Sequence, residues 1–394
     1  MKRPRRQLVL LGEPTAAPRI DRGVLTTPEV DAMLAAAAPV AIGASGGKDS
    51  CVLGFAVIEH LAAVGHRGPR ILIHADLGRV EWKDSAPTCA RLADRLGVEL
   101  VTVRREAGDL MDRWLVRWKN NVARFEALSC VRLILPWSTA SMRFCTSEMK
   151  TAIICREILR RWPRQAALSA CGIRRQESTN RAKALIAKPQ PKLFGRLHGG
   201  TGLDWNAILD WTVEDVFAFL AARAFPLHEA YTRFGSSRCS CAYCILASLP
   251  DLIAAASCPD NADIYREMVD LEIVSSFSFQ ASRWLGNVAP LLLTEEQREG
   301  LAEAKQRAAL REAVEARIPK KLLYTKGWPT CVPTRDEAEL LAEVRRAVAD
   351  IMGFTGMRCL TADSVIARYE ELMAAKAARG GGEADDGADD AEAA

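Results

Sequence analysis

The sequence predicts an α/β protein with a doubly wound, mainly parallel sheet of five strands, followed by a helical C-terminal domain. Short apolar runs bounded by glycine or charged residues alternate with amphipathic segments along the first half of the chain. That alternation is typical of βαβ units, which build parallel sheets with right-handed crossovers. After residue 245 the apolar residues recur at helical spacing.

Five apolar runs are the predicted strands, and segments with helical spacing lie between them. The strands are predicted at residues 39–44, 70–76, 98–105, 165–175 and 204–211, and the fourth of these segments is a strand that leads into a loop. The helices are predicted at residues 27–37, 49–63, 83–96, 146–162 and 212–223. Thr27, Thr146 and Thr212 are the candidate N-caps, although Thr146 lacks the Glu or Gln of a full capping box.

The rest of the chain reads as an insertion and a helical domain. Residues 106–140 look irregular and are predicted to lie over the sheet. Helices are predicted at 247–256, 260–273, 294–316, 335–351 and 361–378. The resulting regions are an N-terminal extension (1–35), an α/β domain (36–245), a helical domain (246–379) and an acidic tail (380–394). The tail has six acidic and no basic residues, so we expect it to be disordered.

Composition favours a cytoplasmic protein without a membrane partner. The 394 residues are 49% hydrophobic and 26% charged, and no run approaches 18 uncharged apolar residues. The basic start has too short an apolar part for a signal peptide. Without the acidic tail, 53 basic residues face 43 acidic ones. That surplus fits a nucleic acid or nucleotide partner, and scattered solvated arginines explain it equally well.

The segment Ser-Gly-Gly-Lys-Asp-Ser follows the first predicted strand and predicts a phosphate-binding loop. It is not a Walker A loop, because Gly43 and Gly47 are one residue too close and Asp49 replaces the hydroxyl residue. Glycines let backbone N–H groups approach an anion, a lysine adds charge, and the following helix points its positive end at the site. The predicted contacts are Ser45, Gly46, Gly47, Lys48, Asp49 and Ser50.

Twelve cysteines occur in a chain without a secretion signal, so we expect no disulfides. Cys239, Cys241 and Cys244 lie within six residues, a spacing that can surround one metal centre. A zinc ion, with His228 as a further ligand, and an iron–sulfur cluster are both compatible with this spacing.

These motifs resemble a known family. Residues 45–50 look like the PP-loop of the ATP pyrophosphatases, which grips the pyrophosphate part of ATP. The stretches "HADLGRVEW" (74–82), "RFCTSEMK" (143–150), "CGIRRQESTNRA" (171–182), "ILDWTVEDVFAFL" (208–220) and "PLHEAYTRFGSSRCSCAYC" (226–244) are similar, in order, to motifs of the phosphoadenosine-phosphosulfate reductase branch. The resemblance covers about residues 40–245 and implies the adenine nucleotide α-hydrolase-like fold.

The resemblance implies roles for residues outside the loop. Basic side chains would bind phosphate or sulfate oxygens, a carboxylate would accept from a ribose or base amine, and another would orient an arginine. We expect Lys48, Asp49, Arg174 and Arg175 to be catalytic. The other residues expected to bind the nucleotide are Asp76, Lys150, Glu177 and Arg181, and Mg²⁺ is expected to arrive on the ATP.

The resemblance also favours a [4Fe–4S] cluster over zinc. Several relatives pair two cysteines in the "RFC" segment with a later Cys-x-x-Cys. This chain has only Cys145 in the first segment but gains an extra cysteine in the second. The expected ligands are therefore Cys145, Cys239, Cys241 and Cys244.

One departure separates this chain from the sulfonucleotide reductases. Their Glu-Cys-Gly-hydrophobic-His motif is absent, and Cys359 lacks the neighbouring Glu and His. The chain then most resembles the sulfurtransferase subunit of DNA phosphorothioation systems. We expect it to activate a DNA backbone phosphate with ATP, with a cysteine desulfurase as sulfur donor.

Other functions remain open from the sequence. They are a reductase of adenylyl-sulfate or phosphoadenylyl-sulfate with another nucleophile, a tRNA thiolation enzyme, and a non-catalytic nucleotide- or DNA-binding module. Relatives that synthesise FAD share the loop but need no clustered cysteines, so they rank lower.

Overall fold

The computed structural model describes residues 22–194 and 201–379. Its contacts divide the chain into two units, and each is described by itself. The first comprises Met1–His74, Asp84–Val103 and Ile154–Thr232, and the second comprises Ala75–Lys83, Arg104–Ile153 and Arg233–Ala394. The predicted boundary after residue 245 stays a prediction. The predicted disordered tail and most of the predicted N-terminal extension lie outside the described residues.

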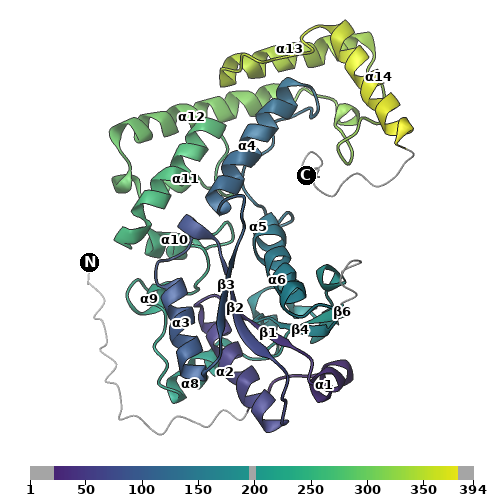
Figure 1. Ribbon diagram of the computed structural model, residues 1–394. Helices are drawn as coiled ribbons and strands as arrows, with labels where there is room; N and C mark the ends of the chain where they lie inside the picture. Colours follow the sequence, from purple (N-terminus) through teal and green to yellow (C-terminus); the bar gives the residue numbers. More distant parts are fainter. Residues whose placement is uncertain (1–21, 195–200, 380–394) are drawn as a thin grey trace, which may run out of the picture. The chain divides into compact units, whose positions relative to one another are not determined.

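The first unit contains a mainly parallel sheet with the strand order β3-β2-β1-β4-β6-β5 (Figure 1). β1 pairs in parallel with β2 and with β4, and β4 pairs in parallel with β6. The strands are β1 Val40–Ala44, β2 Arg70–Asp76, β3 Leu100–Arg104, β4 Ala166–Ala170, β5 Ala187–Pro189 and β6 Thr201–Trp205. The predicted α/β fold with a parallel sheet is confirmed.

Two details of the predicted sheet are wrong. The sheet has a sixth strand, β5, which pairs antiparallel with β6 and ends at Pro189. The sequence of β5 contains no apolar run because β5 is an edge strand, and most of its side chains are exposed to solvent. The strand predicted at 204–211 ends at Trp205 instead. Residues 206–211 turn back on themselves, with Leu209 N–H donating to the Asn206 carbonyl at 3.2 Å.

Helices cover both faces of this sheet, as a doubly wound fold requires. α1 Pro28–Ala35, α2 Lys48–Ala63, α3 Ser85–Leu96 and α8 Val213–Ala222 are the helices of one side. Their apolar residues share a core with Val40 and Ile42 of β1. On the other face, Ala41 packs in a second core with Ile158 of α6 Ile153–Arg161. Alternate residues of β1 are thus buried on opposite faces, which explains its continuous apolar run.

Local capping signals set most of the helix starts. The Thr27 hydroxyl accepts from the Val30 N–H, and Thr212 forms a capping box with Asp215. Thr146 caps nothing, so that prediction is wrong. The helical path begins earlier, with α5 Phe144–Thr146, and continues through a π-helix, η2 Ser147–Ala152, into α6. A π-helical turn of this kind often marks a functional site.

The second unit contains a long helix that the sequence pattern hid. α4 Leu110–Glu126 occupies about half of the stretch predicted to be irregular, and it begins with a capping box between Asp109 and Asp112. Two of its buried positions hold the polar residues Arg117 and Asn121. These residues interrupt the apolar period, so the helical spacing could not be recognised.

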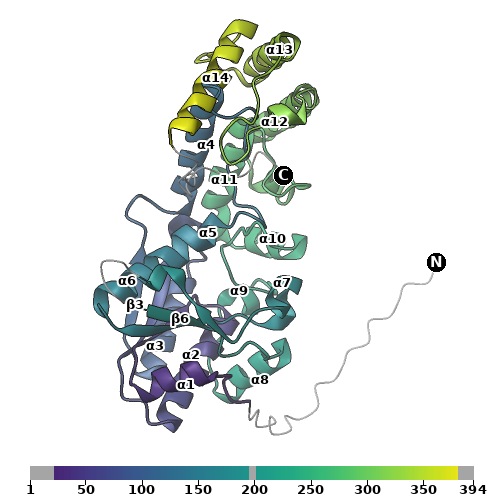
Figure 2. The same cartoon turned by 90° about the vertical axis from the view of Figure 1, so that its right-hand side faces the viewer.

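The helices predicted after residue 245 are confirmed. They are α10 Leu249–Ala256, α11 Ala262–Ser275, α12 Glu295–Glu315, α13 Arg335–Met352 and α14 Ala362–Ala378. α11, α12, α13 and α14 each contact the next (Figure 2). Within the described ranges, no helix is long and apolar enough to cross a membrane.

Short helices complete the two units. They are α7 Thr179–Ala182, α9 Glu229–Thr232, η1 Gly78–Val80, η3 Arg175–Glu177, η4 Pro191–Leu193, η5 Pro259–Asn261, η6 Leu285–Asn287, η7 Pro290–Leu292 and η8 Lys320–Leu322.

Candidate functional site

The Ser45–Ser50 loop lies at the carboxyl end of β1. β1 has β2 on one side and β4 on the other, so the sheet order reverses direction here. In open α/β sheets ligands bind at such a switch point. α2 begins at Lys48 with Gly47 as its N-cap, and no side chain caps it. The end of the helix therefore presents backbone N–H groups and positive dipole charge, as the sequence predicts.

Two glycines allow the loop to pack closely against its surroundings. Gly46 has φ +74°, and a Cβ there would lie 2.9 Å from the Ser85 carbonyl oxygen. Gly172 follows β4, and a Cβ there would lie 3.0 Å from the Asp49 carbonyl oxygen. Any larger residue at either position would push the loop away from the backbone that supports it.

The Ser50 hydroxyl holds the loop together from inside. It accepts from the Ser45 N–H at 3.1 Å and donates to the Gly47 carbonyl at 2.8 Å. The Ser45 hydroxyl lies 3.2 Å from it. Ser50 is buried, so its hydroxyl shapes the loop and is not presented to solvent.

Lys48 is buried beside two aromatic rings. Its side chain is 6% exposed, and its ammonium lies 3.4 Å from the Asp49 carboxylate. The ammonium also lies 5.3 Å from the centre of the Tyr231 ring and 5.8 Å from that of Phe217. The Lys48 N–H donates to the Tyr231 hydroxyl at 3.2 Å. A phenol oxygen therefore occupies one of the positions where a helix N-terminus would bind an anion.

Asp49 and Arg174 form a tight pair across the switch point. Arg174 Nε donates to Asp49 Oδ1 at 2.6 Å, and the Arg174 side chain is 5% exposed. The guanidinium also donates to Gln176 Oε1 at 3.0 Å. The pair connects the loop after β1 to the segment after β4. Arg174 thus fixes Asp49 instead of standing free for a phosphate.

The other basic residues of this motif are also paired. Arg175 Nε contacts Asp210 Oδ1 at 2.5 Å and its guanidinium donates to the Ala182 and Ala184 carbonyls. Glu177 forms an ion pair with Arg181 and accepts from the Arg174 N–H at 2.7 Å. The motif therefore forms a cross-linked loop in the first unit.

Asp76, at the end of β2, belongs to the second unit and shapes a turn there. Its carboxylate accepts from the Gly78 N–H at 2.7 Å and from Arg104 Nε at 3.0 Å. Gly78 has φ +73°, and a Cβ there would lie 2.4 Å from Asp109 Cβ. The turn therefore requires both residues of the Asp-x-Gly motif, the aspartate as hydrogen-bond acceptor and the glycine for its positive φ.

The Cys239–Cys244 loop, also in the second unit, is held at both ends. Before it, Ser236 and Ser237 donate to the Asp251 carboxylate, with the Ser237 N–H at 2.7 Å. After it, Gln280 Nε2 donates to the Ile245 carbonyl at 3.0 Å. In its middle, Cys241 forms an antiparallel bridge with Glu81. These contacts fix the backbone that carries the three cysteines.

The second unit brings Cys145 and Lys150 within electrostatic reach of this loop. The pKa of the Cys241 thiol is raised by burial, lowered by the Lys150 ammonium, and raised again by Cys244 and Cys145. All four predicted ligands are half-buried. Cys145 lies in α5, and Lys150 lies in the π-helix η2 that follows it directly.

These four thiols fit the donor set of an iron–sulfur cluster. Among the described residues, no three of their sulfur atoms lie within 4.8 Å of one another. Thiolates around one tetrahedral zinc ion are only about 3.8 Å apart, so the spacing of these sulfur atoms fits a single zinc ion less well. The alternative with His228 fits less well. Its Nδ1 accepts from the Ala230 N–H at 2.9 Å, and its Nε2 lies 3.3 Å from Ser85 Oγ.

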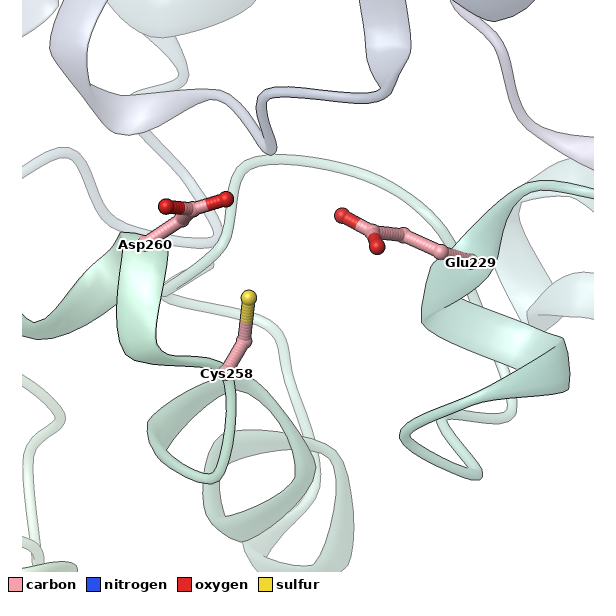
Figure 3. Close-up of side chains that lie close together, drawn as sticks. All are labelled: Glu229, Cys258 and Asp260. Carbon is pink, nitrogen blue, oxygen red and sulfur yellow. The ribbon is translucent and has the colours of Figure 1, made fainter.

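A further cysteine, Cys258, is drawn with Asp260 and Glu229 in Figure 3. Asp260 pairs with Lys83 at 2.9 Å within the second unit. Cys258 and Asp260 belong to the second unit and Glu229 to the first, so we assign no ligand site to these three.

Sequence reasoning missed two features of the site. Tyr231 lies in a quoted motif, but nothing in its spacing indicated that its hydroxyl would meet the Lys48 N–H. The π-helix that follows Cys145 and contains Lys150 has no recognised sequence signal. Of the predicted residues, the loop, Arg174, Arg175, Glu177 and Arg181 lie in the first unit. Asp76, Lys150 and the four cysteines lie in the second.

The fold and the loop define the class first: an α/β enzyme of the PP-loop type that uses a nucleotide. A model of the phosphoadenosine phosphosulfate reductase domain matches residues 39–245, which is more than half of the chain. The chain therefore belongs to this family.

The other comparisons add little. No curated protein matches the chain. Among solved structures, the chain is similar to FMN adenylyltransferase of Candida glabrata in complex with FAD and inorganic pyrophosphate. The identity is 14%, the TM-score is 0.28, and the match covers 51% of this chain and 54% of that one. The chain thus spans about half of that protein, and a likeness of this size supports no conclusion.

Proposed function

We propose that this chain is an ATP-dependent sulfurtransferase that activates a nucleic-acid phosphate, with the DNA backbone as acceptor. An oxygen of the backbone phosphate attacks the α phosphorus of ATP, and pyrophosphate leaves. Sulfur at the oxidation level of hydrosulfide then attacks the activated backbone phosphorus, and AMP leaves. The product is a phosphorothioate, so the overall reaction is DNA phosphorothioation.

The buried Lys48 at the start of α2 is the observation that carries this proposal. Its ammonium and the N–H groups of the loop would stabilise the charge on the departing pyrophosphate, with Mg²⁺ arriving on the nucleotide. Low exposure strengthens this interaction because water screens it little. Asp49, fixed by Arg174, keeps the lysine in place.

Tyr231 has a definite part in this scheme. Its hydroxyl accepts a hydrogen bond from the Lys48 N–H. When ATP binds, a phosphate oxygen would accept from that N–H in place of the hydroxyl. A phenol can also donate a hydrogen bond. The Tyr231 hydroxyl would therefore donate its O–H to the phosphate bound at the Ser45–Ser50 loop.

The cysteines support a sulfur-related activity. Cys145, Cys239, Cys241 and Cys244 would hold a [4Fe–4S] cluster, which would supply a place to bind sulfur. A cysteine desulfurase would deliver that sulfur as a persulfide, and two thiols of a reductant would release it as hydrosulfide and leave as a disulfide. Lys150 would add positive charge beside these thiolates.

Cys359 gives no support to the reductase alternative. It follows α13 and has φ +55°. Burial raises the pKa of its thiol, against the lowering effect of Arg345. A nucleophilic cysteine needs the opposite shift, since the thiolate is the reactive form.

The test measures AMP and pyrophosphate release by anaerobically purified protein. DNA, tRNA and adenylyl-sulfate are offered in separate reactions with sulfide as the sulfur source. We expect AMP formation that depends on DNA, and nuclease-resistant phosphorothioate dinucleotides in the DNA digest. Lys48→Met should lower both by about 10²–10³-fold, and Lys119→Met is the matched control.

Each other outcome selects a different function. Thiolated nucleosides in the tRNA reaction would replace DNA by tRNA as acceptor. Sulfite release from adenylyl-sulfate would indicate a reductase. ATP binding without AMP formation in any reaction would indicate a non-catalytic module.

A further inference from the structure

Polar side chains form a stripe along one face of α4. The stripe consists of Arg113, Arg117, Asn120, Asn121 and Arg124, which are spaced four, seven, eight and eleven residues from the first. That spacing keeps them on one side of an α-helix. They line a cavity of about 340 Å³ together with Arg105, Val116 and Glu148. We call this cavity the α4 groove, and all of it belongs to the second unit.

The α4 groove carries a surplus of positive charge. It contains four arginines and one carboxylate. That carboxylate, Glu148, is already bound by Arg113, with Nε at 2.8 Å and the second nitrogen at 3.2 Å. In the described part of the chain Arg124 makes no ion pair, and Arg105 only donates to the Ala107 carbonyl. Nothing in the groove therefore neutralises Arg105 and Arg124.

The inner part of the groove is buried, and its arginines contact an aromatic ring. Arg117 is 3% exposed, and its Nε donates to the Leu135 carbonyl at 3.1 Å. The guanidiniums of Arg113 and Arg117 lie 4.7 Å and 5.0 Å from the centre of the Phe144 ring. Stacking on an aromatic ring keeps a guanidinium plane oriented and leaves N–H groups for an oxyanion.

The α4 groove is next to the segment that contains Cys145. Phe144, which lies under two of its arginines, is bonded to Cys145. Glu148 lies in η2, the π-helix that also carries Lys150. A ligand in the groove would therefore lie beside one of the two segments that carry the predicted cluster ligands.

The geometry points to a polyanion. From Arg113 to Arg124 the stripe extends about 16 Å along the helix, because each residue rises 1.5 Å. Cations in a line match the repeated phosphates of a nucleic-acid strand, whereas a free phosphate or sulfate would need cations that converge on one point. We propose that the α4 groove binds backbone phosphates of the nucleic-acid acceptor. This inference rests on the proposed function for the identity of that acceptor.

The test is direct binding without ATP. Anisotropy of labelled single-stranded and duplex DNA is measured against salt with the full chain and with Arg105→Gln and Arg124→Gln. Lys119→Gln is the matched control, because Lys119 is exposed on the same helix and lies about 140° around it from Arg124. It removes the same charge outside the groove.

We expect each arginine variant to weaken binding roughly three- to tenfold, whatever the DNA sequence. Each should also reduce the slope of log K against log salt by about 0.7 on single strands and about 0.9 on duplex DNA. Lys119→Gln should change affinity less than about twofold and leave the slope unchanged. Thermal midpoints should stay near that of the unmodified protein, since neither arginine is ion-paired.

Three results would overturn the inference: no DNA binding by the unmodified protein, an equal loss in Lys119→Gln, or arginine variants with unchanged affinity and slope. Inorganic phosphate that raises the thermal midpoint only when both arginines are present, without any effect on DNA binding, would assign the groove to free anions instead. Because no ATP is present, absence of AMP formation would sink the proposed function without changing these outcomes.

Discussion

The Ser45–Ser50 loop and the Cys239–Cys244 loop are built in opposite ways. In the first, Lys48 is buried and the charged side chains are bound to partners, as with Asp49 and Arg174 at 2.6 Å. In the second, the thiols are half-buried and no three of their sulfur atoms lie within 4.8 Å of one another, while Asp251 and Gln280 hold the backbone from outside. The side chains of the Ser45–Ser50 loop are therefore preorganised by one another, whereas the Cys239–Cys244 loop is held through its backbone. Under the proposed function, the cluster would complete this second site, which we call the cysteine centre.

The largest expected effect concerns the preorganised loop. Lys48→Met should lower the rate of AMP release by about 10²–10³-fold, because it removes charge from a site that water does not screen. Methionine still packs against Tyr231 and Phe217, so the thermal midpoint should change little. Steady-state assays compare it with Lys119→Met. A variant that keeps more than about a tenth of the rate would show that the loop does not act through this charge.

The cysteine centre should respond through its metal content. Cys145→Ser, purified anaerobically, should lose more than half of its iron and sulfide, because one of four ligands is gone. Cys331→Ser, also half-buried in the second unit, is the control and should keep its full content. A full cluster in Cys145→Ser would contradict the assignment of Cys145 as one of four cluster ligands.

Acid should weaken the first unit through His228. Burial lowers the pKa of His228 to about 4, against the raising effect of Asp84. Since the unfolded chain binds this proton near pH 6.5, the stability from neutral His228 is present above that pH and is lost as pH falls toward 4. The full loss is at most about 3 kcal/mol. Urea unfolding between pH 7 and pH 4 measures it, and His228→Gln should flatten that part of the profile.

The smallest effect concerns the scaffold of the cysteine loop. Asp251 accepts from Ser236, Ser237 and Ser248, and these hydrogen bonds lower its pKa against burial, which acts to raise it. Asp251→Asn should cost about 1–2 kcal/mol of stability, because charge-assisted bonds become neutral ones. Iron incorporation should fall while DNA-independent ATP binding stays. Unchanged iron content would show that the loop needs no outside support.

Much of the first unit was predictable because its signals are local. Parallel strands buried on both faces give continuous apolar runs, which is why β1, β2 and β4 were recognised. Capping residues such as Thr212 mark helix starts within four positions. The edge strand β5 was not predicted because it contains no apolar run. The helix α4 was not predicted because two of its buried positions hold Arg117 and Asn121. The π-helix between Ser147 and Ala152 likewise gave no signal.

The sequence by itself determined the loop, its family and the residue types of the site, since these depend on neighbours along the chain. Only the tertiary structure decided which partners those residues have. Arg174 meets Asp49 across 125 positions, and Tyr231 meets the Lys48 N–H across 183. The charged stripe of α4 became a groove only when Phe144 and Glu148 packed against it. Such contacts depend on how separate elements pack, and no short stretch of sequence encodes them.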